Sequence, residues 1–410
     1  MDESGQRHGL RRLPLRTVVE MIALILWARA LRAVADGFVA VLLPAYLLAL
    51  GHGELAVGVL STATLLGSAL ATLAVGRWGK RFPLRELLLA SALLMAGTGV
   101  AFASLSALWP LLVVAFVGPL NPSGGDVSVF LPLEHTMIAA SAPPEKRAHV
   151  FARYSFVGSM AGALGALAAG VPAWLAARGW TELAGLRVMF LAYAALGAAV
   201  WLLYLRLPSA RAEAEGPAAP LGPSRSIVWK LASLFSIDSF AGGLVVNALL
   251  ALWLFQRFGM SVAAAGVFFF WTGLLSASSQ LLAPILARRI GLINTMVYTH
   301  IPASVCLIAA AFTTDMHLAL ALLLARSALS QMDVPARSAY VMSVVTPAER
   351  PAAASFTAVP RSLASAVSPS IAGGLFAAGA FAAPLVACGA LKIAYDLALL
   401  AAFRRVAPRS

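Results

Sequence analysis

An aspartate stands in the opening apolar span of each half of the chain. Asp36 lies in the apolar run 31–51, and Asp238 lies in the run 234–255, half a chain length further on. A carboxylate in a bilayer-spanning helix is costly unless it faces protein or a water-filled cavity. Its recurrence at matching places predicts two copies of one module that face each other across a polar pathway. That pattern is typical of proteins that move solutes across membranes.

Charged side chains recur along the other apolar runs as well. Thirteen Asp, Glu, Lys and Arg residues fall inside them, seven cations and six anions. This near balance is what pairing in a low-dielectric interior requires. Such pairs either neutralise charge or act as proton switches, since protonating the carboxylate frees its cation. Three pairs have the i,i+4 spacing that places both members on one helix face, namely Arg32–Asp36, Asp333–Arg337 and Lys392–Asp396.

Asp36 has two interpretations. It is either a structural partner of Arg32 that orders one end of the first span, or a group that binds a proton or a charged solute at a cavity. Gly37 follows it and Pro44 lies two turns further on, so the helix is able to bend at that depth. We therefore expect Asp36 at the cavity wall, with the structural pair as the alternative.

Asp238 has no cation within helical reach in its own span. Its nearest polar neighbours are Ser236 and Ser239. An unpaired carboxylate in an apolar span is easier to protonate than a paired one, so Asp238 is the better candidate for a proton site. A place near the cytoplasmic mouth is the alternative interpretation.

The fourth apolar run is interrupted between residues 118 and 137 by three Pro and three Gly. Broken helices at membrane depth mark binding sites in transporters, because protein or water must satisfy the freed backbone groups. We therefore expect Asp126, Glu134 and His135 to line a cavity, unless 121–125 forms an outer loop. Glu134 and His135 point to different faces, so we expect no shared metal site. His135 titrates near neutrality and is a candidate for a proton relay.

A second charged group occupies the tenth apolar run and its neighbours. Arg326, Asp333 and Arg337 are the counterpart of the group in the fourth run, and Arg153 and Arg361 occupy matching places in the fifth and eleventh. Salt bridges that close the inward gate or cap helix ends are favoured over substrate contact for these residues. Alternating access needs gates that form in one state and break in the other.

The composition excludes an ordinary soluble domain. Hydrophobic residues make up 60% of the chain and charged residues 11%, with a mean hydropathy of +0.86. Long apolar runs of about 20 residues cross a bilayer as helices, so we expect an all-α polytopic membrane protein with twelve transmembrane helices. The predicted spans are 24–50, 54–76, 84–106, 108–140, 150–176, 184–206, 228–256, 260–287, 290–312, 316–345, 351–378 and 380–403.

The net charge of +13 raises the possibility of a nucleic-acid partner, but its distribution indicates topology instead. Basic residues gather before the first span, between alternate spans, around the central loop and at the end of the chain. By the positive-inside rule this places both termini in the cytoplasm. No cleavable signal or transit peptide is evident, which favours a multi-pass protein of a bacterial inner membrane. Cys306 and Cys388 lie in apolar spans, so neither a disulfide nor a metal site is expected.

The chain divides into two similar halves. The Pro- and Ala-rich stretch 207–227 separates a predicted six-helix bundle over 1–206 from another over 228–410. Gly58 recurs as Gly266 in a similar context, and ordered matches of this kind indicate duplication and pseudo-symmetric bundles. Further matches in the same order are the basic turns at Arg77 and Arg289, the stretches ending at Ala148 and Ala352, and Arg153…Gly170 with Arg361…Gly379.

With these features the chain resembles the major facilitator superfamily across nearly its whole length. The signature turn of that family reads Gly-x-x-x-Asp-Arg-x-Gly-Arg-Arg. Its leading Gly and its Asp fall here on Thr72 and Gly76, a departure at the residue that in the family helps latch the halves together. The fifth span carries a Gly pattern similar to the antiporter motif but without its Pro. The signature residues present are Arg77, Gly79, Lys80 and Arg81.

The resemblance implies a secondary active transporter of a small organic solute, driven by protons and working by alternating access of two rocking halves. A single Asp in the first span is similar to drug-type exporters and favours export. An importer or uniporter, a passive pore or receptor of the same fold, and a membrane-embedded lipid-processing enzyme are the alternatives. No nucleotide-binding loop or metal-phosphate motif is present in the sequence, so we expect neither a catalytic residue nor a cofactor. We expect a monomer in the lipid bilayer, with sodium coupling left open.

Overall fold

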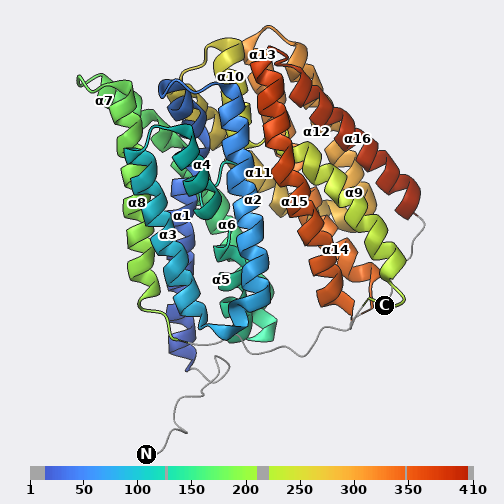
Figure 1. The fold of residues 1–410 in the computed structure, drawn as a ribbon. Helices are drawn as coiled ribbons and strands as arrows, with labels where there is room; N and C mark the ends of the chain where they lie inside the picture. The colour runs from blue at the N-terminus through green and yellow to red at the C-terminus, as the bar shows by residue number, and fades with distance from the viewer. Residues whose placement is uncertain (1–13, 125–127, 210–220, 347–348, 405–410) are drawn as a thin grey trace, which may run out of the picture.

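The computed structural model describes residues 14–124, 128–209, 221–346 and 349–404. Helices and turns account for the described chain, and they form two bundles that stand side by side (Figure 1). The two bundles correspond to the first and the second half of the sequence, as the colours from blue to green and from yellow to red show. The expected all-α architecture is confirmed.

The first bundle contains six membrane spans, two of which are interrupted. Its helices are α1 (Leu15–Ala49), α2 (Glu54–Trp78), α3 (Leu84–Ser104), α4 (Leu108–Val117), α5 (Phe130–Ser141), α6 (Pro144–Leu167), α7 (Val171–Ala176) and α8 (Glu182–Tyr204), with 3-10 turns η3 (Gly79–Arg81) and η4 (Ala168–Gly170). Helices α4 and α5 together form the fourth span, and α6 with α7 forms the fifth. The interrupted fourth run of the sequence is therefore a broken helix.

The second bundle repeats this plan. Its helices are α9 (Arg225–Gly243), α10 (Asn247–Phe258), α11 (Val262–Ile290), α12 (Leu292–Phe312), α13 (Met316–Ser330), α14 (Asp333–Val344), α15 (Arg350–Ala377) and α16 (Ala383–Phe403). The seventh span consists of α9 and α10, and the tenth consists of α13 and α14. The two bundles thus give twelve spans as six plus six. Eight helices of the described chain are long and apolar enough to cross a membrane by length and composition alone.

The halves contact each other near one face only, which we call the far face because it lies opposite the chain ends. There α2 packs along α15, α6 along α11, and α1 against α10. A Cβ atom on Gly58 would lie 2.4 Å from the carbonyl oxygen of Pro369, so only glycine permits this approach of α2 to α15. Polar contacts add to the closure, since Gln256 donates to Glu54 at 2.9 Å.

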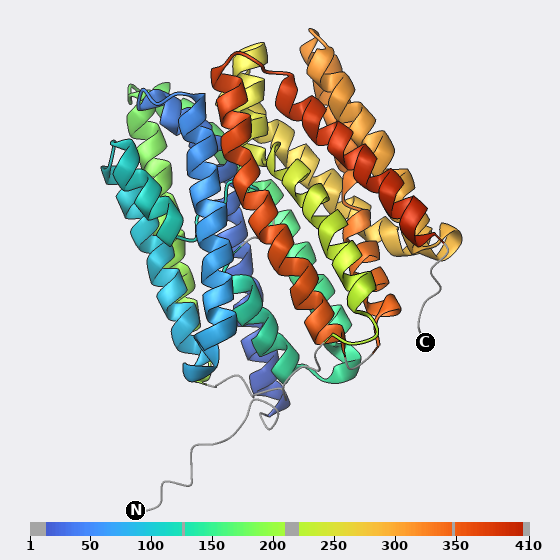
Figure 2. The same cartoon turned by 45° about the vertical axis from the view of Figure 1, so that its right-hand side comes forward.

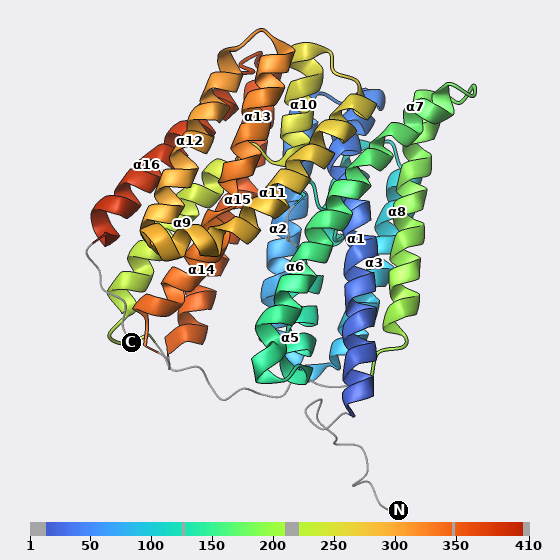
Figure 3. The same cartoon turned by 180° about the vertical axis from the view of Figure 1, so that it is seen from behind.

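Toward the opposite, terminal face the halves separate. Ser355 and Ser362 on α15 are exposed, whereas Pro369 and Gly373, further along the same stripe of the helix, lie against α2. The ribbons diverge in the same direction in Figures 2 and 3, where the lower ends of the two bundles stand apart. The structure is therefore closed at the far face and open toward the terminal face.

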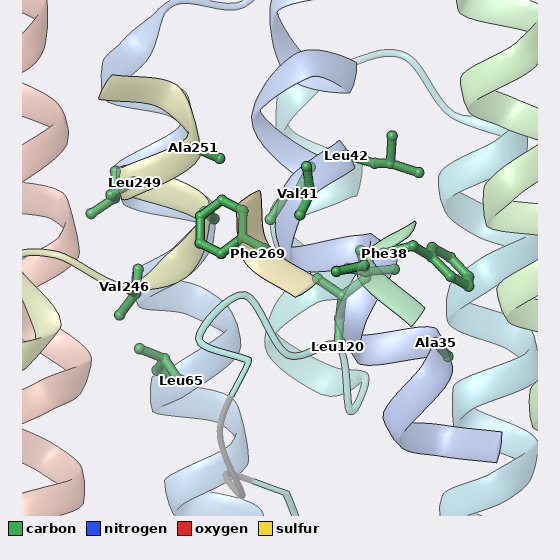
Figure 4. Packing of buried hydrophobic residues seen from close by; sticks show 14 of the residues in the cluster. Ala35, Phe38, Val41, Leu42, Leu65, Leu120, Val246, Leu249, Ala251 and Phe269 are labelled. Atoms are coloured by element: carbon green, nitrogen blue, oxygen red, sulfur yellow. The ribbon is translucent and has the colours of Figure 1, made fainter. Parts of the chain in front are cut away.

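The apolar core follows the same division. One large buried cluster joins both halves near the far face, where α1, α10, α11 and the turn after α4 meet (Figure 4). Phe38 and Leu120 of the first half lie beside Val246 and Phe269 of the second half in this cluster. A separate cluster around Met296 belongs to the second half alone and lies toward the terminal face. Apolar burial thus holds the halves together at one face only.

Candidate functional site

A buried ion pair lies at the centre of the first half. The guanidinium of Arg32 on α1 donates to Oε2 of Glu134 on α5, and both side chains are buried. Tyr154 donates to the same oxygen at 2.5 Å, and Tyr204 donates to Oε1 at 2.6 Å. Both carboxylate oxygens therefore have partners, which a buried ion pair needs if attraction is to offset desolvation.

The expected pair between Arg32 and Asp36 does not form, because Arg32 is bound to Glu134 instead. Helix dipoles favour an acid that precedes its cation by four residues over the reverse order. Arg32–Asp36 and Lys392–Asp396 have the unfavourable order, and neither pair is present. Asp333–Arg337 has the favourable order, and this pair is formed.

Asp36 is half-buried and forms no ion pair with a described residue. The side chain of Asn121, in the turn after α4, donates a hydrogen bond to its carboxylate, and Arg29 and Arg32 lie within electrostatic reach. Arg29 stacks on the ring of Tyr154, with its guanidinium carbon 5.3 Å from the ring centroid. The carboxylate of Asp36 thus lies in a cationic environment in which the nearest strong cation is already bound elsewhere.

Asp238 is not the unpaired carboxylate that its own span predicted. Nζ of Lys392 on α16 lies 2.6 Å from its Oδ1, and Nη1 of Arg337 on α14 lies 3.2 Å from its Oδ2. Arg337 also binds Asp333. Both cations come from helices distant in sequence, so inspection of one span missed them.

His300 on α12 is a member of this network that the sequence analysis missed. Its Nδ1 lies 3.1 Å from Asp396, and its Nε2 lies 3.4 Å from Nζ of Lys392. The expected Lys392–Asp396 pair is replaced by this arrangement, in which the imidazole lies between the two groups. Counting only Asp, Glu, Lys and Arg within the spans excluded histidine; including it would have shown His300 in an apolar run.

Three arginines expected at gates lie in different environments. Nε of Arg361 donates to Ser239 at 3.2 Å, which joins α15 to α9 within the second half. Arg326 on α13 lies near Cys388, and no acid among the described residues binds it. Arg153 is exposed on the same stripe of α6 as the exposed Leu164, so it faces away from the charged centre.

The remaining candidates divide between the site and the surface. His135 packs edge-on against Phe151 and Tyr154 and does not contact the Arg32–Glu134 pair. No group of three potential metal ligands occurs in the part of the chain that the structure describes. Asp126 lies outside the described residues. The signature turn is at the end of α2, where Arg77 and Arg81 are exposed and Gly79 is buried; only the backbone of Lys80 is described.

The breaks in the fourth and seventh spans meet at the interface between the halves. The amide of Ala248, at the start of α10, donates to the carbonyl of Pro122 in the turn after α4 at 3.0 Å. Asn121 is 1% exposed in this turn, so the interruption lies within the protein and not in an outer loop. The side chain that donates to Asp36 is thus adjacent in sequence to a contact with the other half.

Two six-helix bundles that meet at one face, part at the other and bury charge in each centre define a membrane transporter. The sequence pattern of the Major Facilitator Superfamily matches residues 25–332, and the chain belongs to this family. It is therefore a multi-pass transporter of small molecules and not an enzyme, as expected.

Comparisons with individual proteins agree with the family. An uncharacterized membrane protein of Saccharomyces cerevisiae, YJR124C, is 25% identical over 362 residues, covering 79% of this chain and 81% of the yeast protein. A D-xylose–proton symporter has a similar structure, with a TM-score of 0.72 at 17% identity, covering 96% of this chain and 97% of the symporter. A bacterial homologue of the human lysosomal transporter Spinster, in an inward-facing occupied conformation, gives a TM-score of 0.71 at 17% identity, with 95% of each chain covered.

Proposed function

We propose that this protein is a proton-coupled secondary transporter that exports a small organic solute by alternating access. The observation that carries the proposal is the position of Asp36. Its carboxylate is half-buried, forms no ion pair with the described residues, and is hydrogen-bonded to the turn that contacts the other half. A carboxylate in that position is able to bind and release a proton and to influence how the halves meet.

The asymmetry between the two halves supports this assignment. Asp238 is bound by two cations, so in this proposal it is the centre of a charge network that changes partners as the second half moves. Arg337, Asp333 and Arg361 belong to that network and have a gating role. Arg32 and Glu134 hold α1 to α5 and keep Asp36 in place.

The terminal face is proposed to be cytoplasmic. The exposed Arg77 and Arg81 lie at this face, at the end of α2, together with the start of α1 and the end of α16. Positive residues concentrate on the cytoplasmic side of membrane proteins. The structure would then be inward-open, in an inner (plasma) membrane, with a monomer as the transporting unit.

Import by the same fold is the second candidate. It is favoured by the similarity to a D-xylose–proton symporter, whereas a single Asp in the first span favours export. Direction is a property of the coupling, so both candidates share the proton site at Asp36. Sodium in place of protons is a further variant of the same proposal.

Reconstitution in liposomes tests the proposal. A thermal-shift screen of the purified protein against metabolites and drugs identifies a solute, because a ligand of the folded state raises apparent stability. Labelled solute is then followed under an imposed pH gradient. Accumulation against the solute gradient that is abolished by a protonophore supports proton coupling, and the polarity of the productive gradient gives the direction.

Two results would contradict the proposal. Equilibration without accumulation under any gradient indicates a passive pore, and accumulation that follows a sodium gradient at constant pH replaces protons by sodium. Glu86→Gln, which alters an exposed carboxylate on α3, is the control for nonspecific effects of removing an acid.

A further inference from the structure

His300 lies in the middle of the charge network of the second half. Its side chain is 4% exposed. Nδ1 faces Asp396 at 3.1 Å, while Nε2 faces Nζ of Lys392 at 3.4 Å and Oδ1 of Asp238 at 3.9 Å. The same Oδ1 atom accepts from Lys392 at 2.6 Å. One imidazole nitrogen and one ammonium group are therefore placed around a single carboxylate oxygen.

The contacts fix which ring nitrogen carries the proton. A lysine ammonium has hydrogen-bond donors and no acceptor. Nε2 of His300 must therefore present its lone pair to Lys392, and the ring proton is on Nδ1, where it donates to Asp396. Pairing one ring nitrogen with a carboxylate is a common way to set the tautomer of a histidine. The arrangement is that of a neutral imidazole between an ammonium and a carboxylate.

Adding a proton reverses the role of Nε2. The new N–H would point at the ammonium of Lys392, which has no lone pair to accept it and carries the same charge. The nearest acceptor is Oδ1 of Asp238. We propose that Nε2 of His300 is a proton-binding site of the second half, at which protonation replaces Lys392 by His300 as the partner of Asp238.

Lys392 has a second partner within reach. Asp396 lies one turn further along α16, and its described hydrogen-bond partner is His300 alone. An i,i+4 pair of this kind places both groups on one helix face. The Lys392–Asp396 pair, absent in this state, would form when His300 takes the place of Lys392 at Asp238. Asp396 is thus a positioning residue in the neutral state and the acceptor of the displaced lysine in the protonated state.

The surroundings of His300 confine this exchange to the second half. The helices packed on α12 bring no other histidine to the ring, and the exposed Arg288 and Arg289 lie at the far end of α11. The exchange alters the link between α9 and α16, the helices that carry Asp238 and Lys392. The titratable and charged groups around the ring are Asp238 on α9, Arg326 on α13, Asp333 and Arg337 on α14, Arg361 on α15, and Cys388, Lys392, Tyr395 and Asp396 on α16.

The position of the ring proton is directly measurable. Solid-state NMR of protein labelled with 15N-histidine and embedded in nanodiscs distinguishes protonated from unprotonated ring nitrogens, and His300→Gln identifies the signals of His300 among the six histidines. At high pH the expected state has Nδ1 protonated and Nε2 bare; lowering the pH converts it to imidazolium. A high-pH state with Nε2 protonated and Nδ1 bare would overturn the inference. This measurement on the wild-type protein is independent of whether any variant folds.

The link to Lys392 is tested by removing its charge. Lys392→Met takes a cation away from Nε2, so the conversion to imidazolium should move to higher pH by about one unit. Lys230→Met removes the charge of an exposed lysine on α9 and should leave the conversion unchanged. An unchanged conversion in Lys392→Met would show that Lys392 does not control the proton at His300.

The consequence for transport rests on the proposed function, whereas the proton site does not. His300→Gln should retain solute exchange in liposomes but flatten its pH profile. The expected NMR result in a protein that transports no solute would leave the site intact and overturn the proposed function. A reversed tautomer in a protein that accumulates solute would overturn the site alone.

Discussion

Arg32 binds Glu134, which is 102 residues away in the chain, and not Asp36, which is one turn away on the same helix. The choice separates two roles that the sequence had joined. Arg32 and Glu134 form a buried structural pair that two tyrosines complete, and Asp36 is left beside the interface with a hydrogen bond from Asn121. The predictions below test this division and its counterparts in the second half.

Glu134→Gln should destabilise the protein strongly. Removing one partner of a buried ion pair leaves the other charge uncompensated, at a cost of about 3 kcal/mol or more. Thermal unfolding of the purified protein measures the effect. Glu20→Gln, which removes the acid of the exposed Arg16–Glu20 pair, should change stability by less than about 1 kcal/mol. Equal effects of both substitutions would show that the Arg32–Glu134 pair is not structural.

Asp36→Asn and Asp238→Asn should have different effects. Asp36→Asn removes the proposed proton site without breaking an ion pair, so gradient-driven accumulation should be lost while solute exchange and the unfolding temperature are retained. Asp238→Asn leaves Lys392 and Arg337 without this acid and should lower the unfolding temperature as well. Liposome transport and thermal unfolding of both variants provide the comparison. Full accumulation by Asp36→Asn would exclude this carboxylate as the coupling site.

Gly58→Ala should open the far face. The added Cβ would meet the backbone of Pro369 and Gly373 at 2.4–2.8 Å, so α2 and α15 must move apart. Overpacking of this kind costs about 1–3 kcal/mol, and 1.4 kcal/mol corresponds to a tenfold change in a conformational equilibrium. Distances between spin labels on Leu55 and Arg257, which are exposed near the far face, report the change.

Gly76→Ala is the matched control for Gly58→Ala. It lies on the same helix, gains the same helical propensity, and has no atom within 4 Å of an added Cβ. The label distance should therefore be that of the wild-type protein. Longer distances in both variants would indicate an effect of glycine replacement on α2 itself and not of the close approach at Gly58.

Glu349 should make stability depend on pH at acidic values. At the start of α15 its carboxylate accepts hydrogen bonds from Thr346 at 2.6 Å and from Ser224 at 2.7 Å, which ties α15 to the start of α9. These hydroxyl groups lower the pKa of Glu349 from 4.5 to about 2. A lowered pKa in the folded state gives stability that is present above 4.5 and is lost as the pH falls from 4.5 through 2.

Unfolding temperatures of the wild type and of Glu349→Gln between pH 7 and pH 3 test this contribution. The difference between the two proteins should be largest at neutral pH and should shrink as the solution becomes more acidic than 4.5. Glu182→Gln, at the exposed first turn of α8, serves as the control. A difference that stays constant over the whole range would show that ionisation of Glu349 does not contribute.

The order of charges along a helix explains which sequence predictions about pairing held. Asp333 precedes Arg337, and the pair forms; Arg32 precedes Asp36 and Lys392 precedes Asp396, and neither pair forms. The spacing alone treated these cases as equal. The orientation relative to the helix dipole is also legible in the sequence and would have separated them.

Hydropathy, basic loops and repeated motifs along the chain determined that this protein has twelve membrane spans in two similar halves. These features are local, because a bilayer demands about 20 apolar residues for each crossing wherever the segment lies. The break in the fourth span was equally visible, since Pro and Gly act on the backbone beside them.

Only the tertiary structure decided the partners of the charged groups. Asp238 is bound by residues that lie 99 and 154 positions away, and His300 reaches Asp396 across 96 positions. Such contacts depend on the packing and rotation of helices against one another, which no single span encodes. A buried charge requires a partner, so the sequence shows that partners must exist. Which helix supplies each of them is fixed by the fold.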